Sequence, residues 1–212
     1  MTTEKLMMHK PMFTGIVTDI GEVLAVERRA EGLSRFAIGC AYDPGSMAIG
    51  ASIACAGICL TMVAIGEADG RTTFEVDAAA ETLTTTTAGR WRIGTRINLE
   101  RSLKLGDELG GHLVAGHVDG IAEIIAREDL PDMARLAVRA PPSLARFIAP
   151  KGSVTLDGVS LTVNAVERDT FSTLVIPHTL AVTTFGTTKK GDALNLEVDL
   201  MARYAARLTD KS

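Results

Sequence analysis

The 212-residue chain is poor in aromatic residues and has no excess of basic ones. Aromatic side chains make up 4% of the sequence, and the formal net charge at pH 7 is -4. Proteins that bind nucleic acids usually present a clustered basic face, or aromatic rings on which bases stack. The composition therefore argues against a nucleic-acid partner, while a hydrophobic share of 46% is sufficient for a packed core.

Cysteine is also scarce, since Cys40, Cys55 and Cys59 are the only three. Residues 1–11 contain no apolar segment of the kind found in secretion signals. An odd number of cysteines without such a signal favours free thiols in a reducing compartment, so a cytoplasmic protein is expected. No metal is expected, because the C-x3-C spacing has no second pair of ligands beside it.

The sequence contains two copies of one module. Four blocks of the first half recur in the same order in the second half, two with an offset of 101 residues and two with an offset of 97. Ordered self-similarity of this kind indicates a tandem duplication. The matched blocks are 12–27 with 113–128, 50–64 with 151–165, 81–87 with 178–184, and 94–100 with 191–197.

Each copy alternates short apolar or β-branched segments with turn signals rich in Gly, Pro and Asp. This pattern predicts about six strands per copy, which fits a small closed barrel without exposed strand edges. Asp157-Gly158 is expected to form a tight turn between two strands. Helices are expected at 142–148 and 200–208, the second with an apolar stripe that needs a partner surface. In the first copy the expected strands are 20–26, 34–38, 52–54, 61–65, 72–76 and 96–99.

One apolar run has the length of a membrane span. Residues 47–66 contain no charged side chain over twenty positions. The equivalent segment of the second copy, however, contains Asp157 and Asn164, which would be costly in lipid. A buried strand-turn-strand unit is therefore expected, and no membrane partner.

Four motifs together resemble the riboflavin synthase family, the alpha-chain type with a duplicated lumazine-binding domain. The motifs are MFTGIV (12–17), GICLTM (57–62), GGHLVAGHVDG (110–120) and LDGVSLTV (156–163), and the resemblance extends from Met12 to about Leu208. It implies an all-β fold of two tandem six-stranded Greek-key β-barrels with a short C-terminal helix. The domains would be an N-terminal extension (1–11), a first lumazine-binding barrel (12–110), a second one (111–199), and a trimerisation helix with its tail (200–212).

The resemblance also implies an activity. Members of the family are transferases that act on two molecules of 6,7-dimethyl-8-ribityllumazine without a metal or an organic cofactor. Transfer of a four-carbon unit between them gives riboflavin and 5-amino-6-ribitylamino-pyrimidinedione, in the last step of riboflavin biosynthesis. The family implies a homotrimer, with each active site between the first barrel of one subunit and the second barrel of its neighbour.

A duplicated chain suits this chemistry, because donor and acceptor are the same compound. Two facing pockets would convert a bimolecular reaction into a local one. One substrate must lose a proton from its C7 methyl group and the other must be attacked at C7, so equivalent pockets should differ in a few residues. The mismatched pairs are Cys59/Ser160, Ala56/Asp157, Ile16/His117 and Glu81/His178.

The family positions imply which residues form the site. The implied catalytic residues are Phe13, Ser52, Cys59, His117 and Asp157. The implied substrate-binding residues are Gly15, Ile16, Val17, Cys59, Leu60, Thr61, Asp77, Glu81, Thr82, Gly116, His117, Val118, Lys151, Ser160, Leu161, Thr162, Ile176, Pro177, His178, Thr179, Leu180 and Ala181.

Several of these roles have alternatives. Phe13 either covers a lumazine face or fills the barrel, and Asp157 serves the turn, the chemistry or both. The nucleophile is left open among Ser52, Cys59, water and a substrate hydroxyl. His178 departs from an acidic residue found in some family members. The alternative function is a non-catalytic lumazine or flavin carrier, and a third interpretation is a barrel module used only in assembly. The full set of site-type residues in both halves favours the enzyme.

Overall fold

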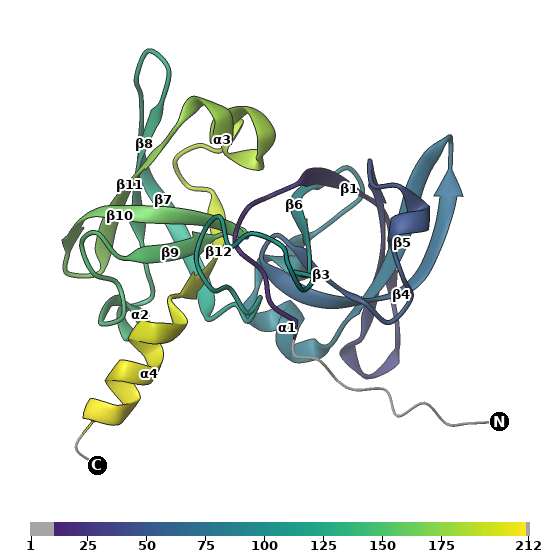
Figure 1. The fold of residues 1–212 in the computed structure, drawn as a ribbon, viewed down its shortest axis with the longest axis horizontal. Helices are drawn as coiled ribbons and strands as arrows, with labels where there is room; N and C mark the ends of the chain where they lie inside the picture. Colours follow the sequence, from purple (N-terminus) through teal and green to yellow (C-terminus); the bar gives the residue numbers. More distant parts are fainter. Residues whose placement is uncertain (1–10, 211–212) are drawn as a thin grey trace.

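The first half of the chain folds into a closed antiparallel barrel of six strands, as its alternating pattern predicts (Figure 1). This computed structural model describes residues 11–210, so the expected N-terminal extension lies outside the described residues except for Pro11. The strands are β1 (Asp19–Arg28), β2 (Ser34–Cys40), β3 (Ser52–Cys55), β4 (Ile58–Ala68), β5 (Arg71–Ala78) and β6 (Arg96–Arg101).

The second half repeats this barrel. Going around the first barrel the order is β1-β2-β5-β4-β3-β6, and the second barrel has the equivalent order. Strands β3, β4 and β5 are neighbours in chain order, and β5 then pairs with β2. This is a Greek-key connection. The all-β fold with two six-stranded Greek-key barrels is thus confirmed. The second set of strands is β7 (Gly120–Asp129), β8 (Ala134–Arg139), β9 (Ser153–Leu156), β10 (Val159–Glu167), β11 (Thr170–Val175) and β12 (Ala193–Val198).

Each barrel has its own apolar core. Inward-facing side chains such as Phe74 in the first barrel and Phe171 in the second are almost completely buried. Cys40 and Cys55 belong to the first core, so these two thiols act in packing. Because side chains alternate along a strand, the outer faces of the same strands remain available for ligands.

Within residues 11–210, four short helices and four 3-10 turns accompany the strands. The C-terminal helix lies where the sequence predicts it and projects away from the second barrel (Figure 1). The helix expected at 142–148 is shorter than predicted. The helices are α1 (Ala80–Thr85), α2 (Pro142–Ala145), α3 (Pro177–Val182) and α4 (Leu200–Thr209), and the 3-10 turns are η1 (Ala30–Gly32), η2 (Pro44–Ser46), η3 (Thr87–Arg90) and η4 (Thr184–Gly186).

Helices α1 and α3 are additional to the two helices that the sequence predicts. Their threonines hide the helical signal, because β-branched residues have low helix propensity. In the structure, the hydroxyls of Thr86 and Thr183 donate to the carbonyls of Thr82 and Thr179, both at 2.6 Å. These bonds add a side-chain donor to a carbonyl group in the last turn of each helix, where backbone donors become scarce.

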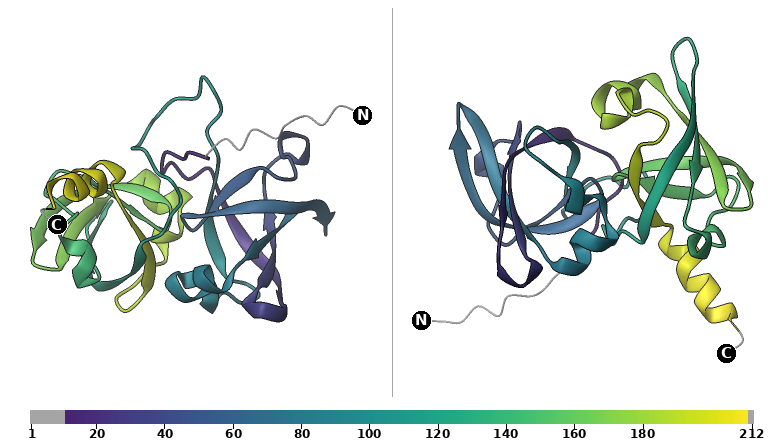
Figure 2. Two further views of the ribbon diagram at one scale, coloured as in Figure 1. Left: turned by 90° about the horizontal axis from the view of Figure 1, so that it is seen from below. Right: turned by 180° about the vertical axis from the view of Figure 1, so that it is seen from behind.

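The two barrels lie side by side (Figure 2). They meet through a nearly symmetric set of hydrogen bonds. The Asn98 amide donates to the Asp157 carbonyl at 2.9 Å, and the equivalent Asn195 amide donates to the Ala56 carbonyl at 2.8 Å. Gly57 and Gly158 face each other so closely that a Cβ on Gly57 would lie 2.7 Å from the Gly158 nitrogen. The duplicated halves therefore meet through equivalent residues.

The apolar run at 47–66 forms the β3–β4 hairpin, as expected, and its inward side chains belong to the first core. None of the helices within residues 11–210 is long and apolar enough to span a bilayer.

Candidate active site

The β3–β4 hairpin presents a polar face on the outside of the first barrel. Ser52 pairs with Thr61 and Ala54 pairs with Cys59 across the hairpin. Ile53 between them is completely buried in the core, so these four side chains point to the opposite, outer side. The structure thus brings the predicted site residues Ser52, Cys59 and Thr61 together.

The β9–β10 hairpin forms the same kind of face on the second barrel. Ser153 pairs with Thr162, and Thr155 pairs with Ser160. Val154 is completely buried, so the four hydroxyl side chains are on the outer side. We call these two surfaces the Cys59 face (Ser52, Ala54, Cys59 and Thr61) and the Ser160 face (Ser153, Thr155, Ser160 and Thr162).

Each face is completed by a segment from the other half of the chain. The Cys59 N–H donates to the Gly116 carbonyl at 2.8 Å, and the Ser160 N–H donates to the Gly15 carbonyl at the same distance. The two segments also contact each other through an isolated bridge between Phe13 and Val114. The predicted substrate-binding residues therefore divide into two crossed sets, one at each face.

Neighbouring residues follow the same crossed arrangement. Val17 packs against the core of the second barrel, and Val118 packs against the core of the first. Ile16 and His117 occupy equivalent positions in the two segments and are both exposed. A ligand on the Ser160 face would therefore meet the isoleucine side chain, whereas a ligand on the Cys59 face would meet the imidazole of the histidine.

A buried glutamate anchors the first crossing segment. One oxygen of Glu100 accepts from the N–H and the hydroxyl of Thr14, at 2.7 and 2.8 Å. Its second oxygen accepts from the Gly15 N–H at 3.0 Å. Burial raises the pKa of Glu100, and these donors offset part of the increase.

The equivalent Glu197 has fewer donors. One of its oxygens accepts from the Ala115 N–H at 2.8 Å, but alanine replaces the threonine found at position 14 and supplies no hydroxyl. The other oxygen is buried and makes no hydrogen bond within the described residues. Burial accordingly raises the pKa of Glu197 to about 7, with backbone N–H groups and Arg203 offsetting part of the increase.

The thiol of Cys59 is half-buried. Burial raises its pKa above the ordinary value, and the hydrogen bond from Ser52 offsets this only in part. Glu197 raises the pKa further through its charge. At neutral pH the site therefore holds a thiol and not the nucleophilic thiolate.

His112 lies on the Ser160 face. Its Nδ1 is 2.7 Å from the Ser160 hydroxyl, and its Nε2 is 3.2 Å from the Thr155 hydroxyl. Burial lowers the pKa of His112, which favours a neutral imidazole that accepts from one hydroxyl and donates to the other. His117, the predicted catalytic histidine, lies five residues further on and is exposed.

Asp157 is not part of the Ser160 face. It forms the β9–β10 turn with φ 44°, and its side chain accepts from the Asn195 N–H at 2.7 Å. It borders a cleft of about 770 Å³ between the barrels, lined also by Asn98 and Thr184. Burial raises the pKa of Asp157 to about 7. The turn role is therefore observed, and a part in the chemistry stays a prediction.

The side chains of three other predicted residues are buried. Phe13 is completely buried and packs with Ala54 and Val114, so it fills the space between the crossing segments. The side chains of Leu60 and Leu161 belong to the two barrel cores. Because side chains alternate along a strand, those of Leu60 and Leu161 point away from the faces. A part of these three residues in substrate binding stays a prediction.

The remaining predicted residues lie in or beside the helices α1 and α3 and next to β9. Glu81 and Thr82 are in α1 of the first barrel. In the second barrel Ile176 precedes α3 and is 52% exposed, whereas Leu180 packs against the core. Lys151 is exposed beside β9. The other residues of α3 on the predicted list are Pro177, His178, Thr179 and Ala181.

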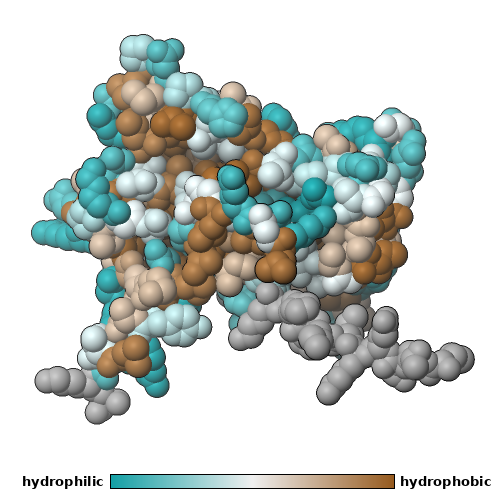
Figure 3. Space-filling model, viewed as in Figure 1, coloured by the Kyte–Doolittle hydropathy of each residue, from teal (hydrophilic) through white to brown (hydrophobic). Residues whose placement is uncertain are grey.

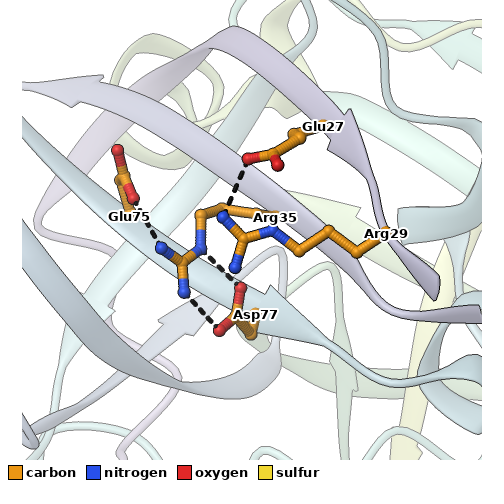
Figure 4. A network of polar contacts seen from close by, with 5 residues as sticks. All are labelled: Glu27, Arg29, Arg35, Glu75 and Asp77. Carbon is orange, nitrogen blue, oxygen red and sulfur yellow. Dashed lines mark hydrogen bonds and ion pairs between the residues drawn. The ribbon is translucent and has the colours of Figure 1, made fainter. Parts of the chain in front are cut away.

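Asp77 forms an ion pair on the outer face of the first barrel (Figure 4). Arg35 donates to both of its oxygens, each at 2.7 Å, and to Glu75 at 3.2 Å. These bonds hold the pKa of Asp77 below its ordinary value. A second pair, Arg29 with Glu27, lies beside it.

Sequence reasoning missed Glu100, Glu197, Arg35 and the position of His112. The glutamates had a visible signal, because GTRINLE and GDALNLE repeat the same Asn and Glu in both halves. No cluster of three or more potential metal ligands occurs among residues 11–210.

Comparisons with known proteins agree with this architecture. The lumazine binding domain family matches the chain twice, at residues 14–102 and 115–199. Riboflavin synthase of Brucella abortus is 57% identical over 198 residues, covering 93% of this chain and 98% of that protein. Riboflavin synthase of Bacillus subtilis is 34% identical over 201 residues, covering 95% of this chain and 91% of that protein.

Solved structures show the same fold at lower identity. The structure of LumP complexed with riboflavin superimposes with a TM-score of 0.78 at 23% identity, covering 88% of this chain and 98% of LumP. LumP complexed with 6,7-dimethyl-8-(1'-D-ribityl) lumazine gives a TM-score of 0.75 at 22% identity. Two domain matches in tandem and relatives this similar over nearly the full length lead to one conclusion: the chain belongs to the riboflavin synthase family of duplicated lumazine-binding domains.

Proposed function

We propose that this chain is a riboflavin synthase, a transferase that dismutates two molecules of 6,7-dimethyl-8-ribityllumazine into riboflavin and 5-amino-6-ribitylamino-pyrimidinedione. The observation that carries this proposal is the pair of equivalent faces on one chain. Each is closed by a segment from the other half. Two binding places for one compound are what a reaction between identical substrates requires.

The differences between the faces fit the need for two roles. The Cys59 face combines a thiol, the exposed His117 and the proton-holding Glu197 close by. The Ser160 face combines hydroxyls with His112. A carboxyl group whose pKa is raised to about 7, like that of Glu197, is suited to proton transfer, which the C7 methyl group requires.

The direct test is to incubate the purified protein with 6,7-dimethyl-8-ribityllumazine and no other reagent. Riboflavin fluorescence should appear, with one riboflavin formed for every two substrate molecules consumed. Tight binding without product would instead support the carrier function. The names of the relatives favour the enzyme, because they are riboflavin synthases at up to 57% identity, whereas the LumP structures are only 22–23% identical.

We further propose a cytoplasmic homotrimer assembled through α4, with each active site between the first barrel of one subunit and the second barrel of the next. Apolar side chains reach the surface of this helix (Figure 3). Met201, Tyr204 and Leu208 are 69%, 62% and 86% exposed, at the spacing of one helical face. A stripe of this kind on a short helix needs a partner surface.

Tyr204→Asp should convert the protein to monomers and lower turnover at least tenfold, because a charge would be buried in the subunit contact. Light scattering and the fluorescence assay measure the two effects. Thr209→Asp, at an exposed position on a different side of the same helix from Tyr204, is the control and should stay trimeric. A monomeric variant with full activity would refute a site shared between subunits.

A further inference from the structure

The Arg35–Asp77 pair borders the Cys59 face. Arg35 on β2 lies directly opposite Asp77 on β5. On the next strand Met62 pairs with Val76, so the register carries Thr61 opposite Asp77. Met62 and Val76 are buried in the core, which directs Thr61 and Asp77 to the outer side. The ion pair therefore continues the polar surface formed by Ser52, Cys59 and Thr61.

The geometry of the pair fixes the Asp77 carboxylate. Arg35 uses its Nε and Nη2 to donate one hydrogen bond to each oxygen, which is the two-pronged arrangement that only arginine can form. Its Nη1 donates to Glu75 and holds the guanidinium from the other side. Each carboxylate oxygen has about two acceptor sites. Asp77 can therefore still accept hydrogen bonds from a ligand hydroxyl.

The second barrel lacks this feature, which makes it an internal comparison. Arg135 on β8 lies opposite Leu174 on β11, at the position equivalent to Asp77. Arg135 instead pairs with Glu128 on the neighbouring strand. Val163 pairs with Thr173, so Thr162 of the Ser160 face lies opposite this leucine. An acidic, hydrogen-bonding border on one face is thus replaced by an apolar border on the other.

We propose that Arg35 is a positioning residue that holds Asp77 to accept hydrogen bonds from the hydroxyl-rich side chain of the ligand, so that the Cys59 face selects for that chain and the Ser160 face does so less. This inference rests on the proposed function, because it assumes a ribityl-bearing ligand. Polyol hydroxyls are good donors to a carboxylate, and a preformed acceptor loses less entropy on binding.

The test compares two flavins that share a ring system. Riboflavin carries the ribityl chain, whereas lumiflavin has a methyl group at the same nitrogen. Binding of each is followed by quenching of flavin fluorescence, without turnover. Arg35→Met should weaken riboflavin at one of the two sites by about tenfold and lumiflavin by less than twofold. Arg35→Lys keeps the charge but loses the two-pronged contact, so it should also weaken riboflavin.

Three further variants make the outcome decisive. Asp77→Asn should have the same ribityl-specific effect, and the double variant with Arg35→Met should be no weaker than either single one. Arg135→Met should leave both flavins unaffected. Equal losses for the two flavins, or unchanged riboflavin binding in Asp77→Asn, would overturn the proposal. If Arg35→Met does not fold, Arg35→Lys tests the positioning role, because it keeps a charge beside Asp77 but loses the two-pronged contact.

Failure of the proposed function gives a different result. The wild-type protein would then bind neither flavin and form no riboflavin from the lumazine. Wild-type protein that binds riboflavin and lumiflavin equally well at both sites would overturn the role of Arg35 while leaving the synthase activity intact.

Discussion

Replacing Gly116 with alanine should destabilise the protein by about 3 kcal/mol and remove most of its activity. Gly116 has φ +75°, a conformation that costs an L-residue energy. A Cβ there would also lie 2.6 Å from the Cβ of Cys59 and 3.0 Å from the Phe13 ring. The crossing segment would have to move away from the Cys59 face. Denaturant unfolding and the riboflavin fluorescence assay measure both effects.

Gly70→Ala is a matched control for this prediction. Gly70 has nearly the same φ, +73°, but nothing lies within 4 Å of an added Cβ. Its substitution should cost only about 1 kcal/mol, from backbone strain alone, and leave the activity unchanged. If the two variants lose stability and activity equally, the close approach of the crossing segment to Cys59 is not important.

Glu197→Gln should make the protein more stable than the wild type at pH 8, by about 3 kcal/mol, with little difference at pH 4. The pKa of Glu197 is about 7 in the folded protein, against an ordinary value of 4.5. The folded state therefore binds the proton more tightly than the unfolded state. This contribution to stability is complete below about pH 4.5 and is lost as the pH rises to about 7. Glutamine keeps an acceptor for Ala115 and cannot ionise. Denaturant unfolding between pH 4 and pH 8 measures this change.

Glu100→Gln should gain less stability at pH 8 than Glu197→Gln does. Burial also raises the pKa of Glu100, but its two oxygens accept three hydrogen bonds from Thr14 and Gly15, and the amide nitrogen of glutamine cannot accept the one from Gly15. Ala115→Thr would offer Glu197 the missing hydroxyl and should reduce the stability lost between pH 5 and pH 8. Some pH dependence should remain in all these variants, because the pKa of Asp157 is also about 7. A Glu197→Gln protein with the pH profile of the wild type would show that this carboxyl is not the titrating group.

The sequence was sufficient to predict what depends on local pattern and on the repeat. Alternation predicted the strands, and Asp157-Gly158 was correctly assigned to a tight turn because both residues have positive φ there. Equivalent residues in the two halves, such as Cys59 and Ser160, were found from a constant offset. Helix α4 followed from the spacing of its apolar residues.

The crossing of the segments could not be predicted in this way. Gly15 contacts Ser160, and Gly116 contacts Cys59. An offset between repeats shows which residues are equivalent, but it does not show which residues of one half contact the other half. The resemblance names Leu60 together with Cys59 and Thr61, and only the structure shows that the Leu60 side chain belongs to the core. The resemblance likewise implies a catalytic Asp157, and the structure shows that its side chain accepts from the Asn195 N–H.

The central claim is that each chain carries two equivalent ligand faces, each completed by the other half. A crystal structure of the protein with riboflavin tests this most directly. One ligand should lie on the Cys59 face against Gly116, His117 and Val118, and one on the Ser160 face against Gly15, Ile16 and Val17. Riboflavin bound instead in the cleft between the barrels, beside Asp157, would contradict the claim.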